Sequence, residues 1–217
     1  MTGSAEGGDP KRATDRAFLA LKQDILDGTL APHSRYLEAE LGERLGMSRT
    51  PIREACIRLA LEGLIEVVPR RGVRVRPISV EEMRDVYEVL GALEARAAQL
   101  ASSRITPDQL AALEDSATRM EAAVIADDRR AWAAADDDFH RLLVQSSGNP
   151  LLAESAGRYC DRVYRARIAT LHLRPMPAGS TRDHQDLVQL IKTGKGQQAH
   201  DDHLAHRIHS GQTARVA

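Results

Sequence analysis

The sequence predicts a mainly α-helical protein in two parts: three short helices with a β-hairpin, and then an antiparallel α-helical bundle. Two observations support this prediction. Apolar residues recur at helical spacing through most of the 217 residues, whereas β-rich residues concentrate between positions 65 and 76. We expect a disordered lead-in over residues 1–10, a first domain over residues 11–76 and a second domain over residues 79–211.

Three helices are expected in the first domain. Apolar spacing predicts the first over residues 12–27 and the second over residues 37–46. Thr50 is the expected N-cap of the third helix, and Pro51 follows at the first helical position, where its missing N–H costs no hydrogen bond. Each of the three helices ends at a glycine: Gly28, Gly46 and Gly63.

A β-hairpin is expected directly after the third helix. Its strands cover residues 65–68 and 73–76, and the turn between them is Pro69-Arg70-Arg71-Gly72. Valine and arginine alternate in the second strand, so that one side of it is apolar and the other basic. Two short helices joined by a tight turn and followed by a basic hairpin are typical of a winged helix-turn-helix.

The third helix carries residue types that suit double-stranded DNA. Arg49 and Arg53 point away from its apolar face near the N-terminal end, where free N–H groups and the helix dipole attract phosphate. Arginine can also donate two hydrogen bonds to guanine, and the hydroxyls of Ser48 and Thr50 suit phosphate oxygens or base edges. The candidate DNA-binding residues are Ser48, Arg49, Thr50, Arg53, Arg70, Arg71 and Gly72.

The hairpin tip is the second candidate contact, because two arginines beside a glycine can approach a minor groove closely. Residues 10–76 hold 13 Lys and Arg against nine Asp and Glu, whereas residues 77–217 hold 17 against 20. This division favours an anionic partner for the first domain alone. The alternative is a small helical domain whose arginines face solvent, and the basic hairpin disfavours it.

Composition excludes other classes of protein. With 3% aromatic residues there are few platforms for stacking unpaired bases, which disfavours a protein that binds single-stranded nucleic acid. No apolar run reaches the length of a membrane helix, and no secretory signal is present. Two cysteines are too few for a disulfide framework. We therefore expect a cytoplasmic protein with no membrane partner.

From Ser79 onward the sequence predicts helices alone. Ser79 with Glu82, and Thr106 with Gln109, match the capping-box pattern. Six helices are expected, over residues 80–102, 107–126, 129–147, 150–170, 181–193 and 196–210. Their short connections predict an antiparallel bundle.

Polar residues interrupt the apolar faces of this bundle. Asp136 and His140 share a face with Trp132, and a carboxylate there is costly to bury without a partner. His184 lies on the inner face of its helix. The last helix offers His203 or His206, and periodicity does not choose between them. A carboxylate and two histidines are thus aimed at one bundle core, and isolated hydrogen-bonded histidines are the alternative to a shared site.

Four segments resemble the GntR family of bacterial repressors: Ile25-Leu26-Asp27-Gly28, the run LGERLGMSRTPIREA over residues 41–55, Glu62-Gly63-Leu64 and Arg70-Arg71-Gly72. The helical second half resembles the FadR-type FCD effector domain. The resemblance implies operator contacts from Ser48, Arg49, Thr50 and Arg53, with Arg71-Gly72 at the wing tip. Ala39 departs from the pattern, since many relatives carry a DNA-contacting arginine there.

In the second domain the resemblance selects His206. FCD domains carry an Asp-x-x-x-His pair followed by two more histidines, which implies the ligand set Asp136, His140, His184 and His206. Nitrogen and oxygen ligands of this kind suit Zn²⁺, our first choice, as well as Ni²⁺ or Mn²⁺. The remaining histidines of the last helix, His200, His203 and His209, are then expected to face solvent.

The resemblance also implies a small organic acid that binds the metal through a carboxylate. Relatives often place a pocket arginine at the position of Leu90. Here we expect a less polar effector, or a carboxylate held by Arg162 or Arg165 instead. These three residues are the candidate effector pocket.

The combined prediction is a homodimeric, non-enzymatic transcriptional regulator, in particular a repressor, whose operator affinity is controlled by a small organic acid. A metal-dependent hydrolase with an accessory nucleic-acid-docking domain is the alternative from another class. A regulator whose metal is purely structural, or is itself the signal, is a third possibility.

Overall fold

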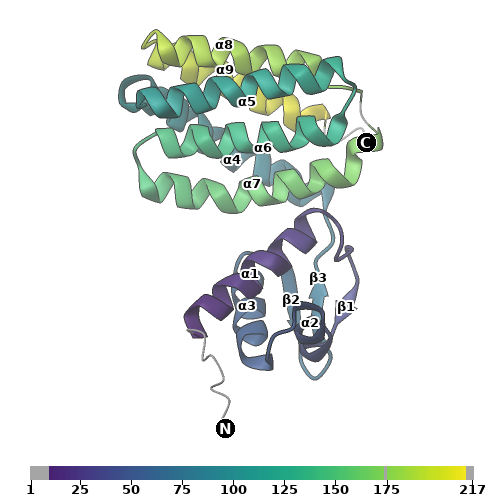
Figure 1. Ribbon diagram of the computed structural model, residues 1–217. Coiled ribbons are helices and arrows are strands. Elements are labelled where there is room, and N and C mark those ends of the chain that lie inside the picture. Colours follow the sequence, from purple (N-terminus) through teal and green to yellow (C-terminus); the bar gives the residue numbers. More distant parts are fainter. Residues whose placement is uncertain (1–9, 174, 214–217) are drawn as a thin grey trace. The chain divides into compact units, whose positions relative to one another are not determined.

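The computed structural model describes residues 10–173 and 175–213. The chain divides into two compact units, Met1–Ile78 and Ser79–Ala217 (Figure 1). Residues 1–9 of the predicted lead-in lie outside the described residues, and Pro10 is the first residue of a helix. The predicted fold class is confirmed: the protein is mainly helical, with one small antiparallel sheet in the first unit.

The first unit contains three helices, α1 (Pro10–Leu26), α2 (Glu38–Leu45) and α3 (Arg49–Leu61). The predicted N-cap of α3 was wrong by two residues: Ser48, with extended backbone, is the N-cap, and Thr50 lies in the first turn. Pro51 is tolerated there because none of the first four N–H groups of a helix has an intrahelical partner. The shift places both hydroxyls and Arg49 at the same helix end.

The sheet has three strands in the order β1-β3-β2, all antiparallel: β1 (Arg35–Tyr36), β2 (Ile65–Val68) and β3 (Gly72–Val75). β2 and β3 form the predicted hairpin, with Val67 opposite Val73. Strand β1 was not predicted, because two residues are too few to show alternation. The apolar side of β3 is buried, as its valines predicted.

The second unit is a bundle of helices: α4 (Val80–Arg104), α5 (Pro107–Ile125), α6 (Arg129–Ser146), α7 (Pro150–Thr170), the 3-10 turn η1 (Leu171–Leu173), α8 (Ala178–Lys192) and α9 (Gly196–Thr213). The capping box of Thr106 and Gln109 forms in both directions. At α4 one half forms: Ser79 accepts from the Glu82 N–H, whereas the Glu82 carboxylate pairs with Arg162.

The bundle core brings four helices to one place. α4 packs against α6, α7, α8 and α9, and α8 packs against α9 (Figure 1). Large apolar residues of α5, α6 and α8 fill the centre, among them Leu113, Met120, Phe139, Leu143 and Ile191. The polar residues on the inner faces of α4, α6, α8 and α9 are therefore buried together. Among the described helices, none is both long and apolar enough to cross a membrane.

Candidate functional site

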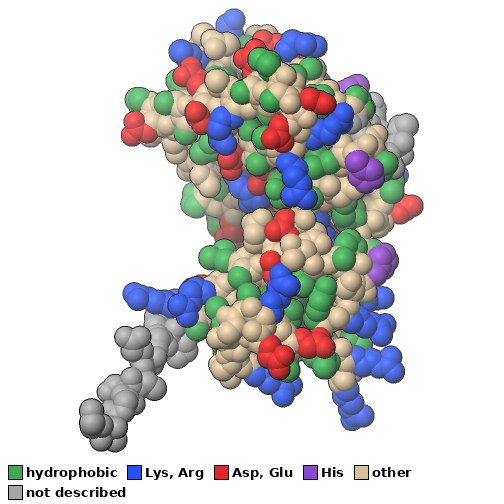
Figure 2. Space-filling model, turned by 45° about the vertical axis from the view of Figure 1, so that its right-hand side comes forward, with side chains coloured by type: hydrophobic (Ala, Val, Ile, Leu, Met, Phe, Trp, Pro, Cys, Tyr) green, Lys and Arg blue, Asp and Glu red, His purple; other side chains and the backbone are tan. Residues whose placement is uncertain are grey.

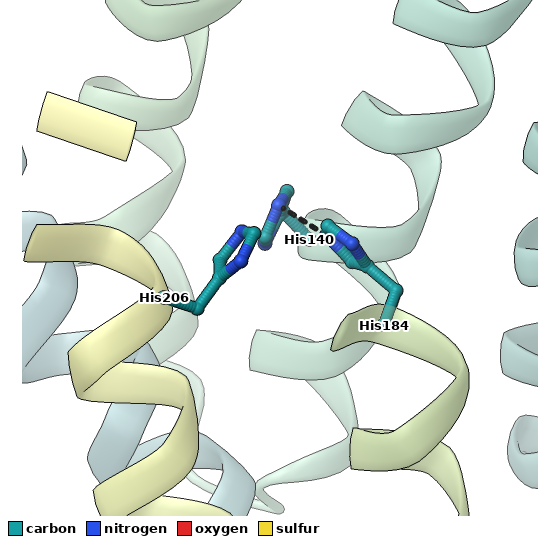
Figure 3. A group of neighbouring side chains, drawn as sticks. All are labelled: His140, His184 and His206. Atoms are coloured by element: carbon teal, nitrogen blue, oxygen red, sulfur yellow. Dashed lines mark hydrogen bonds between the residues drawn. The ribbon is translucent and has the colours of Figure 1, made fainter. Parts of the chain in front are cut away.

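Three imidazoles meet between α6, α8 and α9. His140, His184 and His206 point toward one another (Figure 3), and each offers one ring nitrogen within 4.8 Å of the other two. The Nε2 atoms of His140 and His184 lie 3.0 Å apart. The structure thus brings together the three histidines predicted as ligands, from helices that are separated in the sequence.

Asp136, the fourth predicted ligand, lies one helical turn before His140 and is fully buried. Its two carboxylate oxygens each lie 3.6 Å from an imidazole: Oδ2 from His140 Nε2, and Oδ1 from His184 Nε2. Arg167 of α7 donates a hydrogen bond to Oδ2. Oδ1 has no hydrogen-bond partner among the described residues, so a buried acceptor faces the histidine group.

Burial and neighbouring charges together set the charge state of the group. Burial lowers the pKa of His184 to about 3 and also lowers the pKa of His206. Burial alone would raise the pKa of Asp136, but Arg167 and His140 outweigh it, and the pKa lies well below its usual value. His184 and His206 are neutral and Asp136 is ionised at neutral pH, which is the protonation state that metal binding requires.

The residues present fit a divalent ion. Three imidazole nitrogens and an unsatisfied carboxylate oxygen form a nitrogen-rich set, which suits Zn²⁺, Ni²⁺ or Mn²⁺. His140 supports this fit: burial and Arg207 lower its pKa, but Glu94 and Asp136 outweigh them and raise it. A positive charge is thus favoured between these carboxylates. We call Asp136, His140, His184 and His206 the ion site.

A second buried group, which was not predicted from the sequence, lies on the other side of His140. Glu94 of α4 is 0% exposed, with Oε2 3.0 Å from His203 Nε2 and Oε1 3.4 Å from His140 Nδ1. Arg207 bonds both carboxylate oxygens, one of them at 2.7 Å. We call Glu94, His203 and Arg207 the ionic cluster.

The prediction that His203 faces solvent was wrong, since this residue is 3% exposed. His203 lies four residues after Ala199 and four before Arg207, so that all three share one buried face of α9. A signal for Glu94 was present: it follows Leu90 by four residues on the apolar face of α4. The same reasoning that identified Asp136 would have found it.

A cavity of about 560 Å³ reaches the ion site at His206. Its walls come from the ends of α6, α7, α8 and α9 and include Trp132, Arg129 and Arg167. The indole of Trp132 donates a hydrogen bond to Thr181 at 2.8 Å, and the Arg167 guanidinium lies 5.2 Å from its ring centroid. The cavity thus combines an aromatic wall with two guanidinium groups.

The residues predicted for the effector pocket do not line this cavity. Leu90 is 0% exposed in the core, and Arg162 pairs with Glu82 at 2.8 Å. Arg165 is buried on α7. The positive charge at the cavity comes instead from Arg129 and Arg167, which no spacing in the sequence had indicated, because helix ends distant in the chain form these walls.

In the first unit, the candidate DNA contacts on α3 are exposed. Arg53, Thr50 and Ser48 are all accessible. The side chain of Arg49 is 79% exposed, although its Nε donates to Glu38 on α2 at 2.9 Å. An ion pair this exposed contributes about 0–1 kcal/mol to stability, so that a phosphate can replace Glu38 at little cost.

The wing tip is the turn between β2 and β3. Arg70 and Arg71 are exposed there, and Figure 2 shows basic side chains projecting from the first unit, in the lower part of the view. Gly72 is constrained from within the unit: its φ is +82°, and a Cβ there would lie 2.2 Å from the carbonyl oxygen of Tyr36. The close approach of β1 therefore explains this glycine without any ligand.

Comparison with known proteins gives a match to each unit. Residues 13–75 match the family described as bacterial regulatory proteins, gntR family, and residues 85–207 match the FCD domain. The HTH-type transcriptional repressor RspR of Escherichia coli (strain K12) is 29% identical over 90% of this chain and 86% of its own length. An uncharacterized HTH-type transcriptional regulator in an unstable DNA locus of Streptomyces ambofaciens is 31% identical over 82% of this chain and 74% of its own.

Two solved structures share the fold. E. coli McbR/YncC superposes with a TM-score of 0.81 at 23% identity, over 94% of this chain and 97% of that one. A putative transcriptional regulator GntR from Rhodococcus sp. RHA1 superposes with a TM-score of 0.80 at 18% identity, over 95% of this chain and 99% of that one. These comparisons give no support to the hydrolase alternative. The relatives by sequence are named as regulators or repressors, and the solved structures show a shared fold alone. The chain belongs to the GntR family of bacterial transcriptional regulators, with a winged helix-turn-helix followed by an FCD domain.

Proposed function

We propose that this regulator is a homodimeric cytoplasmic repressor whose affinity for operator DNA is set by a small organic acid bound at a divalent ion in the bundle. The observation that carries the proposal is the convergence of three imidazoles and an unsatisfied carboxylate oxygen at the wall of a cavity. A buried group of this kind at a cavity suits ligand binding better than it suits packing.

Asp136, His140, His184 and His206 would hold the ion, with Zn²⁺ first among the candidates. A bound ion of this type supplies a Lewis acid that accepts a carboxylate oxygen. Arg129 and Arg167 add positive charge to the same cavity, and Trp132 adds an apolar surface. These features favour an acid that is small, anionic and partly apolar.

On the DNA side, the exposed α3 end and the wing tip are the proposed contacts: Ser48, Arg49, Thr50, Arg53, Arg70, Arg71 and Gly72. Two copies would place two recognition helices on a near-palindromic operator. The effector must bind one arrangement of the dimer more tightly than the other, because equal affinity shifts no equilibrium.

A ligand screen tests the sensing half. The melting temperature is measured against a panel of small organic acids, with and without chelator, together with the fluorescence of Trp132, the single tryptophan of the chain. We expect an acid that raises the melting temperature and changes the fluorescence, and that does neither after chelation. If stabilisation by every acid in the panel survives chelation, the ion plays no part in binding.

The same panel separates the regulator from the hydrolase alternative. Esters and amides of the stabilising acid are incubated with the metal-loaded protein, and the products are quantified. We expect stabilisation without turnover. Turnover that disappears in a His184→Gln variant would favour the hydrolase.

DNA binding is tested by selecting genomic fragments on the immobilised dimer and titrating a selected fragment by fluorescence anisotropy. We expect the logarithm of the binding constant to fall linearly with the logarithm of the salt concentration, with a slope of about 0.9 per phosphate contacted. Addition of the stabilising acid should lower the affinity. Tighter binding with the acid would identify an activator or a co-repressed system instead.

A further inference from the structure

We propose that Glu94 is the positioning residue of the ion site: it keeps the proton of His140 on Nδ1, so that Nε2 offers its lone pair to the ion. In this arrangement Arg207 is a resident cation that holds Glu94 in place. The inference rests on the proposed ion site, but it concerns residues on the opposite side of His140 from that site.

The geometry of His140 distinguishes its two nitrogens. Nε2 lies 3.6 Å from Asp136 Oδ2 and 3.0 Å from His184 Nε2, so it faces the ion site. Nδ1 has no hydrogen-bond partner among the described residues, and it lies at ion-pair distance, 3.4 Å, from Glu94 Oε1. A carboxylate beside one ring nitrogen favours the proton on that nitrogen, and metal-bound histidines commonly have such a partner.

His184 has an equivalent constraint of its own. Its Nδ1 donates to the backbone carbonyl of Ser180, which leaves the lone pair on Nε2. With Glu94 acting on His140, both Nε2 atoms point into the same space. In the ion-free protein this 3.0 Å contact is a hydrogen bond in which His140 Nε2–H donates to His184 Nε2, and a bound ion would take the place of that proton.

Two members of the ionic cluster belong to a second group with metal-ligand chemistry, because Glu94, His140 and His203 also bring ligand atoms within 4.8 Å of one another. Arg207 decides between the two groups. It is 1% exposed, it bonds both oxygens of Glu94, and it places a permanent positive charge where a second ion would have to bind. The guanidinium thus takes the place of a metal in the ionic cluster and leaves one ion position in this part of the bundle.

Room for Arg207 is provided by a glycine on α4. A Cβ at Gly91 would lie 3.2 Å from the Arg207 Cβ, which is tighter than ordinary contact. Glu94 lies one helical turn further along α4 from Gly91. The side of α4 that admits the arginine therefore also carries the carboxylate that it binds.

The test uses the full-length chain, stripped with chelator and titrated with Co²⁺, whose absorption spectrum reports ligand number and type. We compare the wild type with Glu94→Gln. The groups that form hydrogen bonds with the Glu94 carboxylate are donors. In Glu94→Gln the side-chain NH₂ would therefore face another donor and could not replace the carboxylate oxygen. We expect Co²⁺ affinity to fall about 10–100-fold, with an altered spectrum.

Two further variants keep the test decisive. In Glu94→Leu/Arg207→Met both charges are removed, so no unpaired buried charge can unfold the chain, and the same loss of affinity is expected. In Asp161→Asn a buried carboxylate outside both groups, paired with Arg141 at 2.7 Å, is removed as a control. This variant should melt earlier but bind Co²⁺ as the wild type does.

NMR of the imidazole nitrogens gives a direct readout of the tautomer. The wild type should carry the His140 proton on Nδ1, and the double variant should not hold it there. The inference would be overturned if both Glu94 variants bound Co²⁺ with the affinity and spectrum of the wild type. It would also be overturned if the wild type bound a second equivalent of Co²⁺ that the Glu94 variants did not bind. A wild type that binds no Co²⁺ at all would instead remove the proposed ion site.

Discussion

His140 and His184 face one another across the bundle, with their Nε2 atoms 3.0 Å apart and their rings inclined by 71°. One residue comes from α6 and the other from α8, and Phe139 packs edge-on against both rings. Apolar packing thus holds two ring nitrogens at hydrogen-bond distance, where a shared cation could replace the proton between them.

Replacement of His140 should abolish the ion. His140→Ala removes Nε2 from the ion site and Nδ1 from the contact with Glu94, so elemental analysis of the purified variant should find no stoichiometric divalent metal. His200→Ala is the control, since His200 lies on the same bundle but pairs with Asp201 on the surface. Full occupancy in His140→Ala would exclude His140 from the ligand set.

The chelated protein should lose stability as the pH falls below 6.5. Burial lowers the pKa of His203 to about 4 and of His184 to about 3, from an ordinary value of 6.5. Between these values the unfolded chain binds protons that the folded chain does not, so each histidine contributes a slope of up to about 1.4 kcal/mol per pH unit. Their full contribution is present above pH 6.5.

Urea unfolding at pH 7.5, 6.5 and 5.5 checks this slope. The raised pKa of His140 has the opposite effect on the free energy of unfolding. The contribution of His140 to stability is constant below pH 6.5 and is lost only as the pH rises above that value. His203→Gln should show a shallower acid slope than the wild type. An unfolding free energy that stays constant from pH 6.5 to 5.5 would contradict the buried neutral state of these histidines.

Two glycines of the first unit should respond differently to the same substitution. Gly28 and Gly72 have φ values of +84° and +82°, but a Cβ at Gly28 meets nothing within 4 Å, whereas at Gly72 it would meet Tyr36. Gly28→Ala should cost about 1–2 kcal/mol from the left-handed backbone alone. Gly72→Ala should cost more, because β1 must also move. Equal melting temperatures for the two variants would show that β1 does not pack closely against the wing.

Arg49→Ala should weaken operator binding and relax base preference, because an arginine at this helix end can contact both guanine and phosphate. Fluorescence anisotropy with the selected fragment and with point variants of it measures both effects. Arg44→Ala is the matched control: Arg44 is also an exposed arginine in an ion pair, with Asp24, but it lies on α2. If Arg44→Ala has the larger effect, α3 is not the recognition helix.

Local patterns in the sequence account for most of the fold. The helix boundaries of the bundle follow from apolar spacing, capping residues and prolines, which act over a few residues and so can be recognised without the tertiary structure. The four-residue interval from Asp136 to His140 places both on one face by helix geometry alone. The run over residues 41–55 identified the family, because few other chains combine these residues at these positions.

The tertiary structure decided which groups meet. Periodicity places a side chain on a face of its helix, but it does not say what lies opposite, and this is why both His203 and His206 turned out to face inward in different environments. The position of Glu94 opposite Arg207, the arginines at the cavity and the approach of β1 to Gly72 all join residues distant in the chain. Such pairings depend on how the helices and strands of each unit pack, and the packing is a property of the whole unit that no single segment encodes.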